Sequence, residues 1–208
     1  MKFRPQYIPK LILLCTFAIA LIPLRASAAL STLKDTVEIV PKSAWNAQAG
    51  RPYKRHVPVK ITVHHEGGKL LTKADDAKQR LKNVQTWSMG PDRKWADIPY
   101  HLLIAPDGTV YQGRDPLTVG ETNTEYDPTG HLLICFLGNY SQQKLDKKLL
   151  KVLVNLLADQ SIKYNISPTE ISTHRDHSKQ TTCPGEDIYS YFKSGYIVEA
   201  VTKEVKKR

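Results

Sequence analysis

Cysteine is scarce in this sequence. Three cysteines occur in 208 residues, and one of them, Cys15, lies in an apolar N-terminal segment. The remaining pair, Cys135 and Cys183, is too small for the disulfide framework that holds small secreted domains together. The fold must therefore be stabilised by a hydrophobic core, to which a bound metal could add. The chain is long enough to form one such core.

Repeats, low-complexity segments and nucleic-acid-binding motifs are also missing. The absence of repeats excludes a repeat architecture. The formal net charge is +10, but no interleaving of aromatic and basic residues accompanies it, which predicts that nucleic acid is not a partner. A positive charge of this size suits a polyanionic neighbourhood such as a bacterial envelope, but a charge count alone favours the simpler explanation of solubility.

The N-terminus has the layout of a secretory signal peptide. Basic "MKFRPQYIPK" precedes apolar "LILLCTFAIALIPL", and small residues with an A-x-A pattern follow at 26–28. We predict cleavage after residue 28 and export to the periplasm or the extracellular space. An uncleaved membrane anchor is the alternative, but the apolar run is short for a span and contains Pro23. The mature chain, 29–208, is predicted to have no stable membrane insertion, and its net charge becomes +6, with 26 basic and 20 acidic residues.

Strand and helix patterns alternate along the rest of the chain. Apolar residues recur at every second position in "VPVKITVHH" and at helical spacing in 73–88 and 144–163. "YHLLIAPDGTVYQGRD" predicts a hairpin that turns at Asp107-Gly108. "HLLICFLGNY" predicts a buried strand, and a helical ending begins at about Glu186. The fold class is therefore α/β, a single domain with a central mixed β-sheet packed by α-helices, and the basic end "VTKEVKKR" is expected to be a solvated helix tail.

Two segments concentrate the residues able to bind a metal. "ITVHHEGG" carries His64 and His65, and "ISTHRDHSKQTTCPGED" carries His174 and Cys183. A catalytic zinc takes three protein ligands and leaves one position for water. Strand alternation places His64 on the polar face and His65 on the apolar face, which favours His64 as the ligand and His65 as a packed or supporting residue. Spacing alone does not establish the site.

Other interpretations of the cysteines and histidines stay open. Cys183 could be a thiol nucleophile with His174 as its base. Cys135 fits a core position in an apolar strand, and a disulfide between Cys135 and Cys183 remains an alternative. The other histidines receive structural interpretations: His101 packed, His56 and His131 solvated, and His177 without an assigned role.

Four motifs taken together resemble one known family. They are "ITVHHEGG", "WADIPYHLLIAPDGTVYQGRD", "HLLICFLGNY" and "THRDHSKQTTCPGEDIY", preceded by "IVPKSAWNA". Their order is similar to that of the peptidoglycan recognition proteins and phage-type zinc amidases. The resemblance covers about 37–191 and implies an amidase domain over 29–208, with the basic tail at its end.

The resemblance implies a zinc N-acetylmuramoyl-L-alanine amidase. Its substrate would be peptidoglycan or muropeptides, and it would act as a monomer with one Zn²⁺ per chain. The implied zinc ligands are His64, His174 and Cys183. Tyr100 would lie near the scissile carbonyl, and Thr181 would occupy a further active-site position.

The resemblance leaves some roles unassigned. The strand that carries a catalytic glutamate in more distant relatives has no acid here. Glu66 is a candidate general base, although a solvated glutamate at a strand end is favoured. Asp176 either orients His174 or caps its loop. A peptidoglycan-binding module without catalysis is the alternative function, and the presence of Cys183 argues against it.

Overall fold

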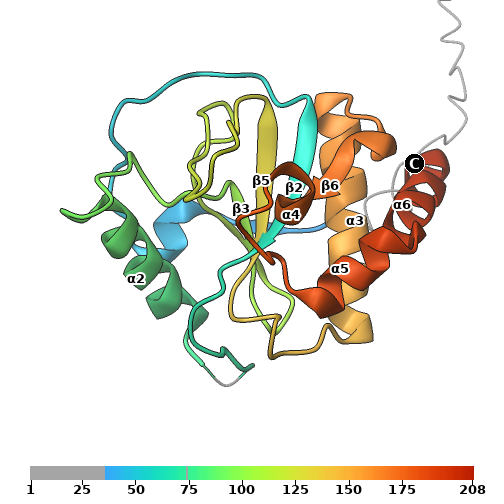
Figure 1. The fold of residues 1–208 in the computed structure, drawn as a ribbon, viewed down its shortest axis with the longest axis horizontal. Coiled ribbons are helices and arrows are strands. Elements are labelled where there is room, and N and C mark those ends of the chain that lie inside the picture. The colour runs from blue at the N-terminus through green and yellow to red at the C-terminus, as the bar shows by residue number, and fades with distance from the viewer. Residues whose placement is uncertain (1–35, 74) are drawn as a thin grey trace, which may run out of the picture. The chain divides into compact units, whose positions relative to one another are not determined.

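The computed structural model describes residues 36–73 and 75–208, so the predicted signal peptide, 1–28, lies outside the described residues. Figure 1 shows helices on both sides of a central sheet. In chain order the elements are β1 (Ile39–Val40), η2 (Lys42–Trp45), β2 (Lys60–His65), α2 (Ala77–Met89), β3 (Leu102–Ile104), β4 (Val110–Gln112), β5 (His131–Phe136), α3 (Lys147–Tyr164), η3 (Pro168–Glu170), β6 (Ile171–Thr173), α4 (His174–His177), α5 (Glu186–Lys193) and α6 (Tyr196–Lys207).

The sheet is mixed, as the sequence predicted. Its strand order is β1-β4-β3-β5-β2-β6. Strands β3 and β4 are antiparallel, and the other neighbouring pairs are parallel. Strand β2 lies between β5 and β6, so the carboxyl ends of these three strands meet at one edge of the sheet. Ligand sites of α/β sheets form at this edge.

Hydrophobic residues cover both faces of the sheet. On one face the strands pack against α3, α5 and α6, and on the other they pack against α2 and Trp45. Strand β3 shows the alternation clearly, since Leu102 and Ile104 belong to the first cluster and Leu103 belongs to the second. Cys135 joins the second cluster and is fully buried, as its apolar strand predicted.

The hairpin between β3 and β4 turns where the sequence predicted. Gly108 has a φ of +90°, a conformation that glycine adopts without strain. The Asp107 carboxylate accepts hydrogen bonds from the Thr109 N–H and from the Thr109 hydroxyl, each at 2.9 Å. An aspartate that bonds its own backbone two residues on stabilises a tight turn.

The C-terminal helix differs from the expected solvated tail. Helix α6 packs against α3, and its Ile197 and Val201 are fully buried. The basic end is also anchored, because Arg208 forms an ion pair with Asp159 across the two helices. The many charges suggested a solvated segment, whereas the apolar residues four apart form a packed inner face. The folded domain therefore includes the whole of this helix.

Two further observations concern the cysteines and the helices of the described residues. Cys135 and Cys183 are both free thiols, so the described part of the chain contains no disulfide between them. Across residues 36–73 and 75–208, the helices are too short or too polar to cross a bilayer.

The sequence-based expectation of solvated rings is wrong for His131, which is buried, while His56 is partly exposed and has partners at both ring nitrogens. His56 donates from Nε2 to the Pro116 carbonyl at 3.0 Å and accepts from the Gly130 N–H at 2.8 Å. His131 is buried, and its Nδ1 lies 2.7 Å from Thr62 Oγ1. Their partners come from other segments, which explains why the local sequence gave no sign of them.

His101 is packed, as predicted, and it joins two segments. Its Nε2 donates to the Thr118 carbonyl at 2.9 Å, and its Nδ1 accepts from the Leu133 N–H at 2.8 Å. Burial lowers the pKa of His101 from 6.5 to about 3. A proton on Nδ1 would remove that acceptor and place a charge in the core, so the neutral ring is the folded form.

We expect His101 to make the folded state less stable in acid. As the pH falls below 6.5, His101 binds a proton in the unfolded chain, whereas in the folded chain it stays neutral until about pH 3. The free energy of unfolding should therefore fall between these values, by about 1.4 kcal/mol per pH unit from this group. Denaturant titrations from pH 7 to 4 measure this slope. His101→Gln should be less stable at pH 7 but show a shallower slope, and equal slopes would contradict the assignment.

Candidate metal centre

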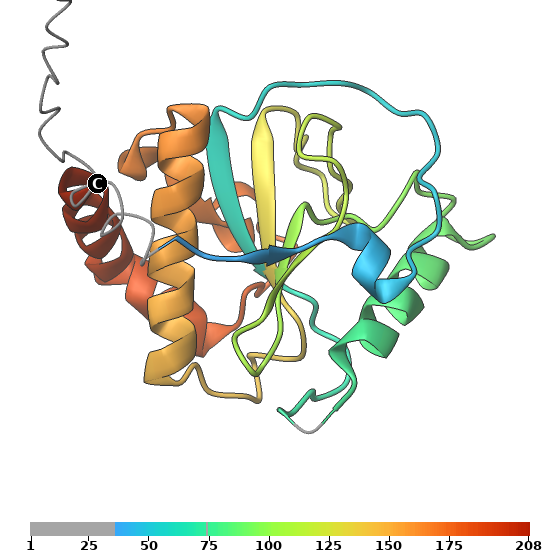
Figure 2. The ribbon, with the colours of Figure 1, turned by 180° about the vertical axis from the view of Figure 1, so that it is seen from behind.

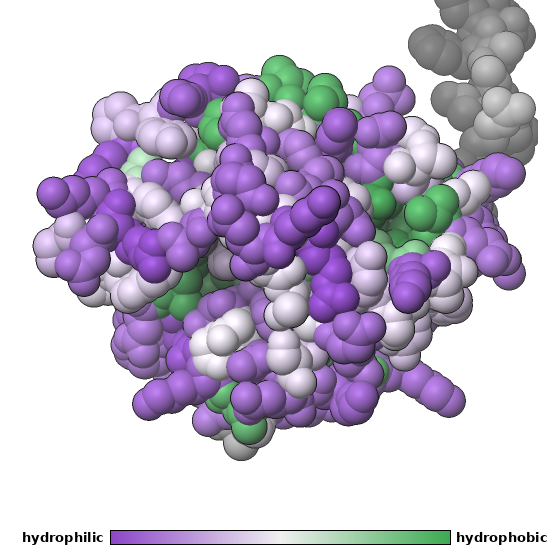
Figure 3. Space-filling model, viewed as in Figure 1, coloured by the Kyte–Doolittle hydropathy of each residue, from purple (hydrophilic) through white to green (hydrophobic). Residues whose placement is uncertain are grey.

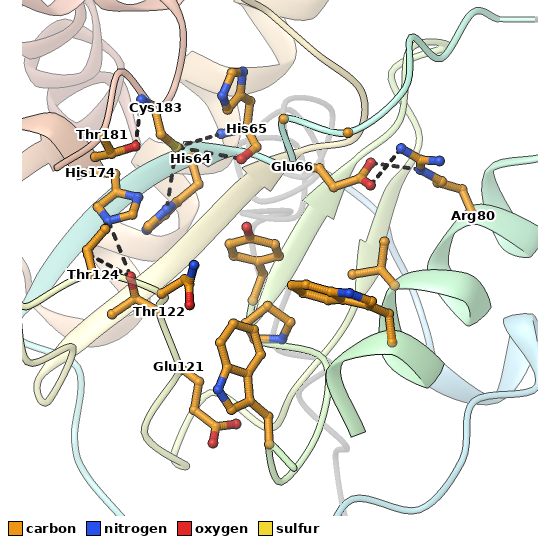
Figure 4. A pocket seen from close by; sticks show the side chains of 18 of the residues that line it. His64, His65, Glu66, Arg80, Glu121, Thr122, Thr124, His174, Thr181 and Cys183 are labelled. Atoms are coloured by element: carbon orange, nitrogen blue, oxygen red, sulfur yellow. Dashed lines mark hydrogen bonds and ion pairs between the residues drawn. The ribbon is translucent and has the colours of Figure 1, made fainter. Parts of the chain in front are cut away.

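Strand geometry brings the two metal-binding segments together. His64 lies near the end of β2, while β6, paired with β2, leads directly into α4, which begins at His174. Cys183 follows on the next loop. The ligand atoms of His64, His174 and Cys183 lie within 4.8 Å of one another, and all three residues are buried. Figure 4 shows their side chains turned toward one another.

This cluster fits a zinc ion. Two imidazoles and a thiol form a common zinc donor set, with Zn–S near 2.3 Å and Zn–N near 2.0–2.1 Å. Tetrahedral geometry would place the sulfur and a nitrogen roughly 3.6 Å apart, and Cys183 Sγ lies 3.7 Å from His64 Nδ1. Structural zinc sites take four protein ligands, whereas this cluster offers three beside an open cleft.

Protonation states also suit metal binding. Burial lowers the pKa of His64 well below 6.5, and it lowers the pKa of His174 to about 4, so both rings are neutral at pH 7 and offer a lone pair. Burial raises the pKa of the Cys183 thiol to about 12. Without a cation this thiol stays protonated, which makes it a poor nucleophile and disfavours the thiol hydrolase. A metal would displace its proton.

Hydroxyl groups hold the outer nitrogens of both rings. His174 Nε2 lies 2.7 Å from Thr124 Oγ1 and 3.3 Å from Thr122 Oγ1. His64 Nε2 lies 3.4 Å from the Tyr126 hydroxyl. Such partners fix the ring orientation of a metal-ligating histidine and leave the other nitrogen, Nδ1, for the ion. No motif in the sequence predicted these three residues; the available signal was the polar run "GETNTEY", which begins at Gly120.

The alternation argument for the paired histidines agrees with the structure. His64 faces the cluster, whereas the His65 ring accepts from the Tyr140 N–H at 3.1 Å on the other side of the strand. The backbone N–H of His65 nevertheless donates to Cys183 Sγ at 3.3 Å. A donor of this kind stabilises negative charge on the sulfur.

Asp176 and Thr181 brace the loop that carries the ligands. The Asp176 carboxylate accepts from the N–H and the hydroxyl of Thr173, each at 2.7 Å, which is a capping box at the start of α4. Asp176 was considered either to orient His174 or to cap its loop, and these contacts are those of a cap. Thr181 Oγ1 accepts from the Cys183 N–H at 3.1 Å and fixes the turn before the thiol.

The sequence favoured a solvated Glu66, but the structure holds its side chain in contacts with other segments. Its carboxylate forms an ion pair with Arg80 of α2 at 2.7 Å and accepts from the Gly138 N–H at 3.2 Å. Figure 4 shows the Glu66 and Arg80 side chains directed at each other. The geometry therefore makes Glu66 part of the cleft wall.

Tyr100 lies beside the cluster. Its ring centroid is 5.3 Å from that of His64, and the ring packs against the α2 side of the core. Burial, followed by the neighbouring Cys135 thiol, raises the pKa of Tyr100 well above 10. The phenol therefore keeps its proton at neutral pH and can act as a hydrogen-bond donor.

A cleft of about 720 Å³ opens over the cluster. Besides the three candidate ligands it is lined by His65, Glu66, Tyr100 and Thr181 from the sequence-based set, and by residues of α2 and of the loop 121–124. The face in Figure 3 is largely hydrophilic, with small separate hydrophobic areas, and it is hollowed. A volume of this size is typical of a small-molecule or oligomer site.

Arg114 holds the loop that forms one wall of this cleft. The guanidinium is 1% exposed and donates to the carbonyls of Ile98, Val119 and Asp97 at 2.9, 2.6 and 2.9 Å. It also pairs with Glu121, which accepts from the Ala96 N–H at 3.0 Å. The wall that carries Thr122 and Thr124 is thereby tied to the segment before Tyr100.

The fold and this cluster define an α/β domain with a candidate single-metal site in an open cleft. Comparison with known families identifies it further, because the N-acetylmuramoyl-L-alanine amidase model matches residues 54–186. The chain belongs to this amidase and peptidoglycan recognition protein family.

The chain is similar both to peptidoglycan recognition proteins and to an amidase. Peptidoglycan recognition protein 1 of Rattus norvegicus is 32% identical over 161 residues, which cover 75% of this chain and 86% of the relative. The structure of peptidoglycan recognition protein-LE in complex with tracheal cytotoxin, a monomeric diaminopimelic acid-type peptidoglycan, has a TM-score of 0.65 and 28% identity, covering 75% of this chain and 92% of that one. The N-acetylmuramoyl-L-alanine amidase LysC of Clostridium intestinale has a TM-score of 0.62 and 25% identity, covering 77% and 98%.

Proposed function

We propose that this protein is a zinc-dependent N-acetylmuramoyl-L-alanine amidase. It hydrolyses the amide between the lactyl group of N-acetylmuramic acid and the L-alanine of the stem peptide. The observation that carries the proposal is the convergence of His64, His174 and Cys183 beneath a substrate-sized cleft. The family supplies the class of substrate.

Side chains around the cluster have distinct parts in this reaction. When bound, zinc would supply an activated water, since it lowers the pKa of bound water to about 7, and would polarise the carbonyl. His64, His174 and Cys183 would hold the ion. The Tyr100 phenol, which keeps its proton, would donate a hydrogen bond to the carbonyl oxygen as negative charge develops there. Thr181 fixes the Cys183 turn and, as part of the cleft lining, would lie at the edge of the substrate.

Partner and location follow from the same proposal. Peptidoglycan or its muropeptide fragments are the partner, as in the solved complex with a monomeric peptidoglycan. Export through the predicted signal peptide would deliver the enzyme to the periplasm or the extracellular space, where this substrate occurs. We propose that the mature protein acts there as a monomer with one zinc ion.

Digestion of a defined muropeptide tests the function. We expect mass analysis to find the free stem peptide and the free lactyl acid. Thorough removal of metal by a chelator should stop this cleavage, and added zinc should restore it, because the ion supplies the attacking water. Binding without cleavage by zinc-loaded protein would favour the non-catalytic module. Cleavage that survives chelation but is lost on thiol alkylation would favour the thiol hydrolase.

A further inference from the structure

Two of the three candidate ligands lie at the ends of one short loop. His174 begins α4, and Cys183 lies on the segment that follows this helix, so the chain must double back to bring both side chains to one point. The backbone closes the loop through the Arg175 N–H, which donates to the Cys183 carbonyl at 3.0 Å. This bond joins the two ends of the loop, but it leaves the turn on either side of the thiol to be held by other groups.

The Arg175 side chain holds that turn from both sides. Its Nη2 donates to the Thr182 carbonyl at 2.9 Å, and its Nη1 pairs with the Glu186 carboxylate at 2.9 Å. The guanidinium carbon also lies 4.1 Å from the centroid of the Tyr189 ring, which is a cation–π contact. Thr182 precedes Cys183, whereas Glu186 and Tyr189 belong to α5. One planar group therefore connects the residue before the thiol with the helix after it.

These contacts leave Arg175 outside the chemistry of the cleft. The side chain is only 18% exposed and does not line the cleft, so it has no route to a substrate there. A guanidinium presents several donors in fixed directions, which suits a group that must bond a carbonyl and a carboxylate at once. Resting on the proposed function, we propose that Arg175 is a positioning residue for zinc, because it holds the Cys183 turn in place before the ion binds.

Preorganisation of the loop is the physical reason for the expected effect. A turn that is already ordered loses little conformational entropy when an ion binds, whereas a loose turn must be ordered at the expense of affinity. The His174 ring has its own partners in Thr122 and Thr124. The position of Cys183 is therefore the part of the ligand set that depends most on Arg175.

Zinc affinity measured without substrate tests the proposal. The purified protein, stripped of metal, is titrated with Zn²⁺ in competition with a chromophoric chelator. Arg175→Gln should bind zinc about 10–100-fold more weakly, the range found for loss of an outer partner of a metal ligand. Arg175→Lys keeps the charge but not the fork of donors, so it should recover only part of this loss. Turnover with excess zinc should return most of the way to the natural value, because the ligands and Tyr100 are unchanged.

Stability measurements separate positioning from a merely structural role. A structural role would lower the free energy of unfolding equally with and without zinc, whereas a positioning role lowers it more in the presence of zinc. Arg208→Gln is the matched control, since this side chain is 10% exposed and pairs with Asp159 and Glu204 on α3 and α6. It should lower stability in both states and leave the zinc affinity unchanged.

The positioning role and the amidase function fail separately. Natural zinc affinity in Arg175→Gln, or in Arg175→Lys should the glutamine variant not fold, would overturn the positioning role. Zinc affinity that depends on Arg175, in a protein that cleaves no muropeptide, would support the positioning role and refute the amidase proposal. Muropeptide cleavage by Arg175→Gln at the natural rate under limiting zinc would refute the positioning role and leave the amidase proposal standing.

Discussion

His64→Ala is expected to leave the purified protein without stoichiometric zinc and without amidase turnover above background. The substitution removes one of three converging ligands and leaves Cys183 facing an empty position. Loss of an outer partner of a metal ligand costs about 10–100-fold in affinity or activity, and loss of a ligand itself should exceed this range. Metal analysis and muropeptide digestion measure the two effects independently.

His65→Ala is the matched control for this experiment, because it changes the same residue type one position along the same strand. Its ring is turned away from the cluster and bonds the Tyr140 N–H. Leaving that buried N–H without a partner should lower the free energy of unfolding by about 1–3 kcal/mol. The backbone N–H that reaches Cys183 is unchanged, so zinc should be retained. Loss of zinc from His65→Ala with retention in His64→Ala would reverse the assignment.

Tyr100→Phe is expected to lower turnover by roughly 10²–10³, the range found when one donor to a developing oxyanion is deleted. The substitution removes one hydroxyl and keeps the ring that packs against the α2 side of the core. The fold and the zinc content should therefore survive. The loss should appear mainly in kcat, because the hydrogen bond strengthens as charge develops in the transition state.

Tyr111→Phe provides the comparison for Tyr100→Phe. Tyr111 is buried in the same cluster but does not line the cleft, so its hydroxyl cannot meet substrate there. Steady-state kinetics on a defined muropeptide, with zinc content confirmed for each variant, distinguish the two. Near-normal kcat in Tyr100→Phe would mean that its hydroxyl serves only solvent or the Cys135 thiol behind it.

The parts of this site that follow regular patterns could be predicted from the sequence. Alternation along β2 assigned opposite faces to His64 and His65, and it located the strand that holds them. The convergence of His64, His174 and Cys183 matched the family resemblance. These features depend on residues close in sequence or on motifs in a fixed order.

The parts that depend on irregular segments could not be predicted. Thr122, Thr124 and Tyr126 lie on a loop whose course no periodicity sets. Glu66 was expected in solvent because its partner, Arg80, comes from the next helix, and His131 was expected there because its partner, Thr62, comes from a neighbouring strand. Contacts between distant segments exist only once the fold has formed.

Arg114 shows how such a contact restricts which residues a position tolerates. Three carbonyls and the Glu121 carboxylate surround its guanidinium, and they require a planar fork of several donors. Lysine would supply the same charge from a single nitrogen and leave buried carbonyls without donors. A lysine at position 114 would therefore keep the charge without replacing the function of the arginine. A homologue with lysine at this position would need a differently built cleft wall to satisfy these carbonyls.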